Sequence, residues 1–585
     1  FKYFILILDI IMKNIFKYIA ISAILLLPLN ACDSFLEESP QGVGDSEALN
    51  TPESIEKMVI AAYSCLGNDN YQDGIKALWP YGDLRSGDSY KGGAGPGDAN
   101  YFNIIETFVY MQEDLSYLDT KWYAEYIAIA RCNDALGRIN AISETDYPKK
   151  ITRESEMRFL RAHFYFGLKI LFKHVPYIDE TDETANYINI SNVEYTDKQL
   201  WDIIINEFRY AAEHLPNDNE DIGRANKWMA KAYLAKALMY AAYEQDEKNN
   251  VTTIDKTKLT EAVNLCDELS AHYSLAADFA NNFLCETENG PESIFAVQHS
   301  LNDGTLRGRL DWGAMLNYPM NPEYGCCGFH SPSQNMVNAF RTDENGLPLF
   351  DSFNNKDLLN SDDLLANNID PRLNHTVAIP GVPYKYDPEF IYESTWARDA
   401  STYGSFLSMK ETVLPDCPCF ATAAPFMSSS KNRDIIRYDD VMLWKAEALI
   451  ELGRPDEALP LINAIRVRAA NSTARLVDVQ GDKTGKFIVS PYNPGINCPE
   501  WTQSFARKAL RWERRLEFSQ EGFHFFDLVR WGIADEFVNS YLAVEKGRRS
   551  YLKEARFTKN RDEYFPIPKN QINFSKKLYQ QNYGW

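Results

Sequence analysis

The chain has 585 residues and a formal net charge of −22 at pH 7, because 82 Asp and Glu outnumber 60 Lys and Arg. Nucleic-acid binding is excluded as a main function, since a surface of this sign repels the phosphate backbone. The length allows a large buried core and more than one domain. Aromatic residues make up 13% of the chain, and these rings either fill a helical core or stand exposed to stack on a ligand.

The ten cysteines and eight histidines form no metal-binding pattern. Neither a CxxC repeat nor a His–Cys cluster has the spacing of a zinc site, and there is no HExxH motif. We therefore expect no metal and no cofactor. Besides Cys32, discussed below, nine cysteines remain, and an odd number cannot all pair within the chain. The candidate disulfides are Cys326–Cys327 and Cys417–Cys419, which lie in loop-like segments.

Near its start the chain has the pattern of a signal peptide. A charged segment begins at Met12 and leads into an apolar run over residues 19–29, which ends just before Cys32. That run is too short to span a bilayer. We predict that residues 1–31 are a signal peptide, that Met12 is the true start, and that residues 1–11 come from a misassigned start site.

The sequence LNAC at 29–32 resembles a lipobox, at which a signal peptidase cuts before a lipid-modified cysteine. Asn30 departs from the usual small or hydroxyl residue, and an ordinary secretory signal with an incidental cysteine is the alternative. We predict lipidation of Cys32, since acyl chains contribute about 0.8 kcal/mol per buried CH₂ and several chains anchor a protein firmly. Residues 32–44 would then be a tether, and its acidic start resembles a surface-export signal.

Beyond the tether we predict a single domain over residues 45–585, in which helices dominate. Its helical scaffold covers about 50–285 and 433–585, and a loop-rich lobe covers about 286–432. Apolar residues recur at helical spacing in the segments at 54–66, 121–142, 154–172, 200–215 and 225–243. The third of these is apolar almost all round, so it should lie at the centre of the fold.

The clearest repeat is a helix pair at 435–470, with predicted helices at 438–452 and 456–468 around a Gly-Arg-Pro turn. Small residues such as Ala448 and Ala458 permit close packing of the two helices, which is typical of tetratricopeptide-like units. Any other antiparallel helix pair is the alternative. Because tetratricopeptide-like units usually bind another protein, we expect a partner surface on this side.

Two segments, at 78–101 and 286–432, lack helical periodicity and are rich in Gly, Pro and aromatic residues. Long irregular segments on a rigid scaffold usually carry function. A sugar ring offers an apolar face to Trp or Tyr and polar edges to Asp, Asn or Arg. For any single aromatic, packing beneath a loop is the alternative. On this basis the predicted ligand-binding residues are Trp79, Tyr81, Asp83, Arg85, Asp88, Trp312, Tyr318 and Tyr324.

The most informative stretch is FARKALRWERRLEFSQEGFHFFDLVRWG at 505–532. Its pattern predicts a helix up to Glu521, a left-handed cap at Gly522 and a second helix at 525–531.

Two glutamates in that stretch admit two interpretations. Glu513 and Glu517 would be the acid pair of a glycoside hydrolase if they faced each other across a bond. However, successive turns of one helix point them the same way, and arginines flank them. We favour a semi-buried charge network that locks two helices, with Asp527 and Arg530 as a further ion pair.

Five motifs resemble the SusD/RagB-like outer-membrane nutrient-binding lipoproteins, in the order of that family. The last departs from the family pattern by carrying Tyr583 where the family has Pro. The segments that carry the resemblance are EMRFLRAHFYFGLKILFKHVPYI, GRANKWMAKAYLAKALMY, AEALIELGRPDEALPLINAIRVR, ERRLEFSQEGFHFFDLVRWG, and YFPIPKNQIN with the terminal QNYGW.

The resemblance implies a mainly α fold of tetratricopeptide-type helix pairs with a loop-rich ligand-binding lobe. It further implies a non-enzymatic surface lipoprotein of a Gram-negative outer membrane, which captures a nutrient oligomer, most often a glycan. Such a protein would form a lid on a SusC-like TonB-dependent transporter. Binding residues follow no fixed motif in the family, so none is carried over. The alternatives are a RagB-like peptide binder, a surface glycoside hydrolase and a plug without a ligand.

Overall fold

The computed structural model describes residues 50–67, 77–305 and 308–585. The predicted signal peptide, Cys32 and the tether lie outside the described residues. Ile55–Trp585 form one compact unit, distinct from the segment before it. Within the described residues, no helix is both long enough and apolar enough to cross a membrane.

Helices dominate the described chain, as predicted. The longer ones are α3 (Pro52–Tyr63), α6 (Ser116–Ala141), α7 (Lys150–Phe172), α8 (Asp197–His214), α9 (Lys227–Ala242), α10 (Lys256–Leu269), α15 (Tyr438–Glu451), α16 (Pro455–Asn471), α17 (Gln503–Glu517) and α19 (Ala534–Arg548). The shorter ones are α4 (Asp83–Ser86), α5 (Asn100–Thr107), α11 (Gln334–Ala339), α12 (Ser361–Ala366), α13 (Arg372–Thr376), α14 (Ala400–Tyr403), α18 (His524–Arg530) and α20 (Lys569–Phe574). The sequence patterns identified most of the longer helices to within a few residues, but not α10 and α19.

The strands form two-stranded ribbons, all antiparallel except the pair of β6 and β12. The pairs are β1 (Ser89–Gly92) with β5 (Phe329–Pro332), β2 (Tyr243–Gln245) with β3 (Val251–Ile254), β4 (Ser293–Val297) with β11 (Arg433–Arg437), β6 (Asn368–Ile369) with β12 (Lys486–Phe487), β7 (Val377–Ala378) with β8 (Leu407–Ser408), and β9 (Phe420–Ala423) with β10 (Phe426–Ser429).

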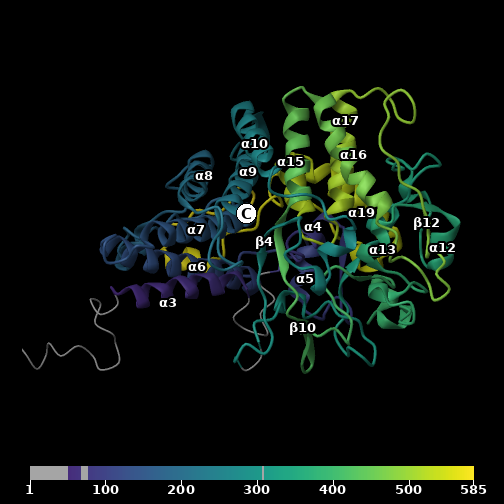
Figure 1. Ribbon diagram of the computed structural model, residues 1–585, viewed down its shortest axis with the longest axis horizontal. Coiled ribbons are helices and arrows are strands. Elements are labelled where there is room, and N and C mark those ends of the chain that lie inside the picture. Colours follow the sequence, from purple (N-terminus) through teal and green to yellow (C-terminus); the bar gives the residue numbers. More distant parts are fainter. Residues whose placement is uncertain (1–49, 68–76, 306–307) are drawn as a thin grey trace, which may run out of the picture. The chain divides into compact units, whose positions relative to one another are not determined.

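The helices pack in series, each against its neighbour in the chain, from α6 to α10 and on to α15 and α16 (Figure 1). Helix α7 is central, as its apolar composition predicts, and most of its residues are buried. Helix α9 packs between α8 and α10, where its alanines, among them Ala235 and Ala237, are fully buried. Small side chains allow this close approach, which is the packing of tetratricopeptide-like units.

The chain between β4 and β11 leaves the helical stack and returns to it, since α10 packs directly on α15. This part of the chain lies within the segment predicted as a loop-rich lobe, about 286–432, and it consists of short helices, short strands and turns. It has hydrophobic clusters of its own, including one of buried rings around Tyr384 and Trp396.

Helix α17 ends at Glu517, one turn before the predicted end at Glu521. Gly522 then has the predicted left-handed conformation, with φ of +82°. Its backbone lies against Gly82, where an added Cβ would stand 1.9 Å from the carbonyl oxygen of Gly522. This close approach of two glycines joins the start of α4 to the turn before α18.

Candidate functional site

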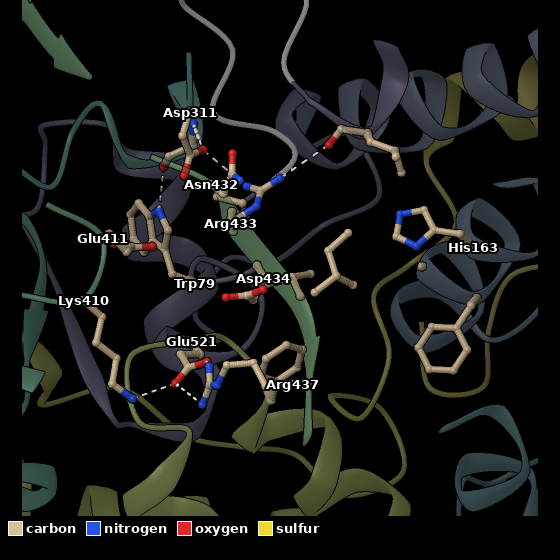
Figure 2. Close-up of a pocket in the computed structure, with 18 of the residues that line it drawn as sticks. Trp79, His163, Asp311, Lys410, Glu411, Asn432, Arg433, Asp434, Arg437 and Glu521 are labelled. Atoms are coloured by element: carbon tan, nitrogen blue, oxygen red, sulfur yellow. Dashed lines mark hydrogen bonds and ion pairs between the residues drawn. The ribbon is translucent and has the colours of Figure 1, made fainter. Parts of the chain in front are cut away.

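A cavity of about 160 Å³ lies between the helical stack and strand β11. Residues of α6, α7 and α9 line one side, and residues of β11 and the turn after α17 line the other. In Figure 2 the strand that carries Arg433, Asp434 and Arg437 runs between His163 and Trp79. His163 and Asp434 are partly exposed, so the cavity opens to solvent.

An irregular strand places successive side chains in this cavity. Residues along a regular strand alternate between two faces, yet Arg433, Asp434, Ile435 and Arg437 all line the cavity. The pairing of β11 with β4 shifts register between Asp434 and Arg437. Such an irregularity re-aims side chains, and here it concentrates charge on one side of the strand.

The cavity lining is unusually rich in charge. Its six cationic residues are Lys121, Lys236, Lys410, Lys431, Arg433 and Arg437, and its five carboxylates are Glu125, Asp311, Glu411, Asp434 and Glu521. In a chain with a net charge of −22, this excess of one positive charge is a local reversal of sign.

Most of these charges are paired. The ion pairs are Lys121–Glu125 (2.7 Å), Lys410–Glu521 (2.6 Å), Arg437–Glu521, Arg433–Asp311 (3.5 Å) and His330–Glu411 (2.9 Å). Burial alone would raise the pKa of Glu521, but Arg437 and Lys410 hold it below its usual value. Each of these buried charges thus has an oppositely charged partner, which offsets the cost of its removal from water.

Three charged groups of the lining form no ion pair with a described residue. Lys236 and Lys431 are 5% and 8% exposed, and neither ammonium group has a hydrogen-bond partner among the residues that the structure describes. Asp434 accepts a hydrogen bond from the Ser293 hydroxyl. Burial lowers the pKa of Lys236 to about 8 and raises the pKa of Asp434 to about 6.

Trp79 is the one predicted ligand residue that lines this cavity. It is 3% exposed, and its indole stacks on the imidazole of His330 with 5.0 Å between ring centroids. His330 lies between the carboxylates of Asp83 and Glu411, each at 2.9 Å. Burial alone would lower the pKa of His330, but Glu411 and Asp83 raise it to about 9, so the buried imidazole is charged.

The other seven predicted residues are at most 3% exposed and do not line this cavity. The guanidinium of Arg85 is held between the rings of Phe525 (4.0 Å) and Phe565 (4.1 Å). Asp88 pairs with Arg515 (2.8 Å) and His524 (2.6 Å). In these contacts the side chains pack beneath loops, which is the alternative to ligand binding that the sequence left open.

The expected platform of exposed rings is therefore not formed by these positions. Tyr81 packs against Phe565, Trp312 packs with Leu310 and Met315, and Asp83 bonds to His330. Tyr318 and Tyr324 belong to the ring cluster of the lobe. As ligand contacts, all eight residues stay predictions.

The charge-network interpretation of the two glutamates is confirmed, but with unexpected partners. Glu513 pairs with Arg372 (2.7 Å) and Arg466 (3.1 Å). Glu517 pairs with Arg372 (2.8 Å) and Arg468. All five side chains are buried, and the arginines come from α13 and α16 rather than from α17 itself.

The predicted pair of Asp527 and Arg530 is also present, at 2.8 Å. Glu517 additionally lies near Glu292 and Asp439, and these three carboxylates are close enough to surround a cation. However, Arg468 already pairs with Glu292 and Arg437 with Asp439. The arginines thus supply the positive charge that a metal would bring.

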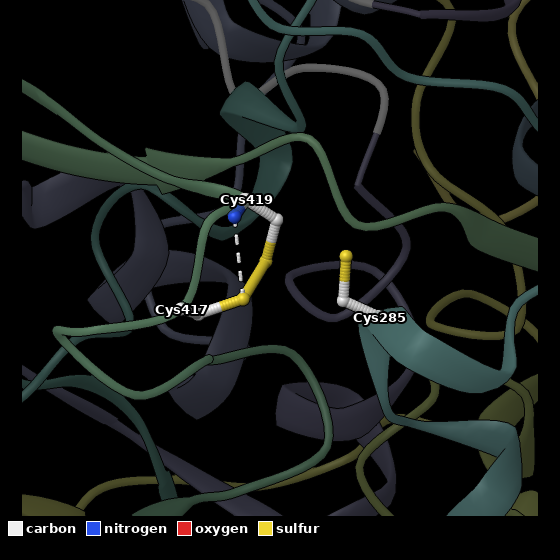
Figure 3. Close-up of side chains that lie close together, drawn as sticks. All are labelled: Cys285, Cys417 and Cys419. Carbon is white, nitrogen blue, oxygen red and sulfur yellow. Dashed lines mark hydrogen bonds between the residues drawn. A yellow bond between two sulfur atoms is a disulfide. The ribbon is translucent and has the colours of Figure 1, made fainter.

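Both candidate disulfides are formed, Cys326–Cys327 and Cys417–Cys419. The thiol of Cys285 lies close to the second disulfide (Figure 3), with the three sulfurs within 4.8 Å of one another. Because Cys417 and Cys419 are joined, they do not offer a pair of thiolates to a metal ion.

The structure is thus a stack of paired helices beside a cavity that charged side chains and aromatic rings line. Residues 291–585 match the model of the SusD family, and residues 34–239 match a model described as starch-binding associating with outer membrane. The chain belongs to the SusD family. The family is associated with the outer membrane and groups binding proteins rather than enzymes.

Similar proteins cover nearly the whole chain. A SusD-like protein of Bacteroides ovatus is 25% identical over 92% of this chain and 87% of its own length. A SusD superfamily protein from Bacteroides vulgatus shares the fold with a TM-score of 0.66, at 21% identity over 91% of this chain and 99% of that one. Surface glycan-binding protein A from Bacteroides thetaiotaomicron, in complex with laminarihexaose, has a TM-score of 0.63 at 20% identity, over 91% of this chain and 99% of that one. These matches confirm the mainly α, SusD-like fold.

Proposed function

We propose that the protein is a surface lipoprotein that captures nutrient oligosaccharides and delivers them to a SusC-like TonB-dependent transporter. The observation that supports glycan capture is membership of the SusD family, together with similar proteins that bind laminarin or laminarihexaose. Capture requires no bond cleavage, since binding energy and later release are sufficient.

The cavity at β11 is the proposed ligand site. It joins apolar rings, among them Trp79 and Phe523, to polar groups such as Asn432 and Asp434. A sugar needs both kinds of contact, one for its C–H face and one for its hydroxyls.

The transporter is proposed to dock against the helix pairs of the scaffold, because stacked helix pairs form extended surfaces for other proteins. Lipidation at Cys32 would hold the protein at the membrane, and release of the ligand would then need only a rigid-body hinge motion of the lid.

Binding of the purified protein to a panel of neutral and charged glycans and peptides tests the proposal, with chromatography of the glycans for cleavage products. Retention without cleavage is expected. Trp79→Ala should weaken retention, whereas Tyr110→Ala should not, since Tyr110 is an aromatic residue that is 81% exposed and not part of the cavity lining.

Other outcomes would favour the alternatives. Binding of peptides alone would indicate a RagB-like peptide binder. Cleavage that one carboxylate substitution abolishes would indicate a glycoside hydrolase. Binding of no ligand in the panel would indicate a plug.

A further inference from the structure

Two lysines of the cavity lining present ammonium groups that have no acceptor among the described residues. Lysine is rarely buried without a partner, because transfer of an unpaired charge out of water is costly. Lys236 and Lys431 both line the cavity, both are more than nine-tenths buried, and both lack a hydrogen bond or ion pair with any described residue. The lining carboxylates Glu125, Glu521 and Asp311 are already engaged with other cations.

The surroundings of Lys236 fix its ammonium group in place. It projects from the middle of α9, and four aromatic rings surround its nitrogen. The distances from the nitrogen to the ring centroids run from 4.8 Å for Phe523 to 6.0 Å for Trp444. Asp440 and Asp527 contribute electrostatically to its environment, but Arg514 pairs with both of them and Arg530 pairs with Asp527, so two guanidinium groups balance these two carboxylates. The rings are Phe166, Tyr233, Trp444 and Phe523. Lys236 is thus held by rings and stays unneutralised.

Lys431 precedes β11 and lies where the cavity meets a second hollow of about 410 Å³. Glu288 also lines that hollow, accepts a hydrogen bond from the backbone of Asn432 at 2.7 Å and interacts electrostatically with Lys431. The one lining carboxylate without an ion pair is Asp434. In the lining of the first cavity, two cations without an ion pair thus stand against one such carboxylate, which is an excess of one positive charge.

We propose that the cavity binds an oligosaccharide through a single anionic group, a uronate carboxylate or a sulfate ester, with Lys236 and Lys431 as its counter-charges. This inference rests on the proposed glycan-binding function and narrows the class of glycan. Both groups offer oxygen acceptors to the two ammonium groups, and charge-assisted hydrogen bonds of this kind are roughly twice as strong as neutral ones.

The test uses calorimetric titration of the purified protein with three probes of similar length. One is a neutral oligosaccharide, one carries a single glucuronate and one carries a single sulfate ester. We expect at least one of the charged probes to bind about tenfold or more tightly than the neutral one, and its affinity to fall with added salt. The two charged probes distinguish a carboxylate from a sulfate.

The variants are Lys236→Met and Lys431→Met, which remove the charge and keep the length of the side chain. Each should weaken the charged probe about tenfold and leave the neutral probe within about twofold. Lys256→Met is the matched control, because Lys256 is an exposed lysine on α10 and its loss changes the net charge equally. Thermal unfolding of each variant confirms that it folds. Lys431 lies outside the helices, so its variant tests the site even if Lys236→Met lowers the yield.

The inference is overturned if both charged probes bind no better than the neutral one, or if the two variants behave like Lys256→Met. In either case, tight binding of the neutral probe would leave the proposed function standing. Binding of acidic peptides but of no oligosaccharide would overturn both proposals.

Discussion

At the residue scale, the sequence identifies charged residues more readily than their partners. The stretch around Glu517 predicted a buried charge network, yet the partner Arg372 lies 145 residues away in the chain. Spacing along a helix reports only neighbours on that helix. The same limit explains why Lys236 and Asp434 were missed as cavity residues. A lysine within the apolar run AYLAKALMY was the available signal for Lys236.

Glu517→Gln should destabilise the protein by about 3–5 kcal/mol, because it leaves Arg372 and Arg468 buried with less negative charge. Urea unfolding followed by circular dichroism measures this loss. Glu554→Gln, at an exposed glutamate, is the control and should change stability by less than about 0.5 kcal/mol. Equal stability of the two variants would contradict the network.

Stability should also depend on pH through His330. Its pKa of about 9 in the folded protein exceeds the value of about 6.5 expected for an unfolded chain. A raised pKa stabilises the fold fully below pH 6.5, and this stabilisation is lost as the pH rises towards 9.

We therefore expect the free energy of unfolding to fall by up to about 3 kcal/mol between pH 6.5 and 9. The expected fall is shown by chemical unfolding at several pH values. His330→Gln should be less stable at pH 6 and should show a flatter profile in this range. A wild-type profile as flat as that of the variant would refute a charged His330.

At the element scale, hydrophobic periodicity predicted most of the longer helices. For the irregular segments, the sequence predicted only that they are irregular, not how their side chains pack. The central position of α7 was predicted correctly, because a helix that is apolar on almost all sides has to be buried. The loop aromatics were predicted as exposed rings, but Tyr318 and Tyr324 pack in a hydrophobic cluster within the lobe. Sequence patterns such as polar–apolar alternation and turn residues do not show whether an aromatic side chain in a loop points into the core. That orientation depends on contacts with residues distant in the sequence.

Gly82→Ala should destabilise the contact between α4 and the turn before α18, because the new Cβ would stand 1.9 Å from the Gly522 carbonyl oxygen. Neither backbone can move without shifting a helix, so we expect a loss of at least about 2 kcal/mol or a loss of soluble protein. Thermal unfolding provides the measurement.

Gly137→Ala serves as the matched control, since an added Cβ within α6 meets no atom within 4 Å. It should raise stability by up to about 1 kcal/mol, as alanine favours helices over glycine. If the two alanine variants unfolded at the same temperature, the close approach at Gly82 would be disproved.

At the scale of the whole molecule, motif order predicted more than composition or spacing did. Five motifs in family order predicted the SusD-like fold, which similar structures confirm at TM-scores of up to 0.66. The proposed ligand cavity was not predictable in this way, because its lining comes from α6, α7, α9 and β11, which lie far apart in the sequence. Composition excluded only a basic, nucleic-acid-binding surface.

Cys32→Ala should abolish acylation and move the protein from the membrane fraction to the soluble fraction, because several acyl chains are needed for stable anchoring. Metabolic labelling with a fatty-acid analogue and fractionation of the cells measure both effects. Cys498→Ala, at a free cysteine, should keep the label. Full labelling of the Cys32 variant would show that the lipobox assignment is wrong.

The ribbon of β4 and β11 has a consequence for how this protein can diversify. The pairing of these strands holds the two ends of the lobe together, so the 135 residues from Gln298 to Asn432 form a closed excursion from the helical scaffold. Lengthening such a closed loop costs little, only about 0.6 kcal/mol for each doubling. Insertions, deletions and exchanged segments within the lobe can therefore change the surface that the lobe presents, while the packing of the helical scaffold stays the same.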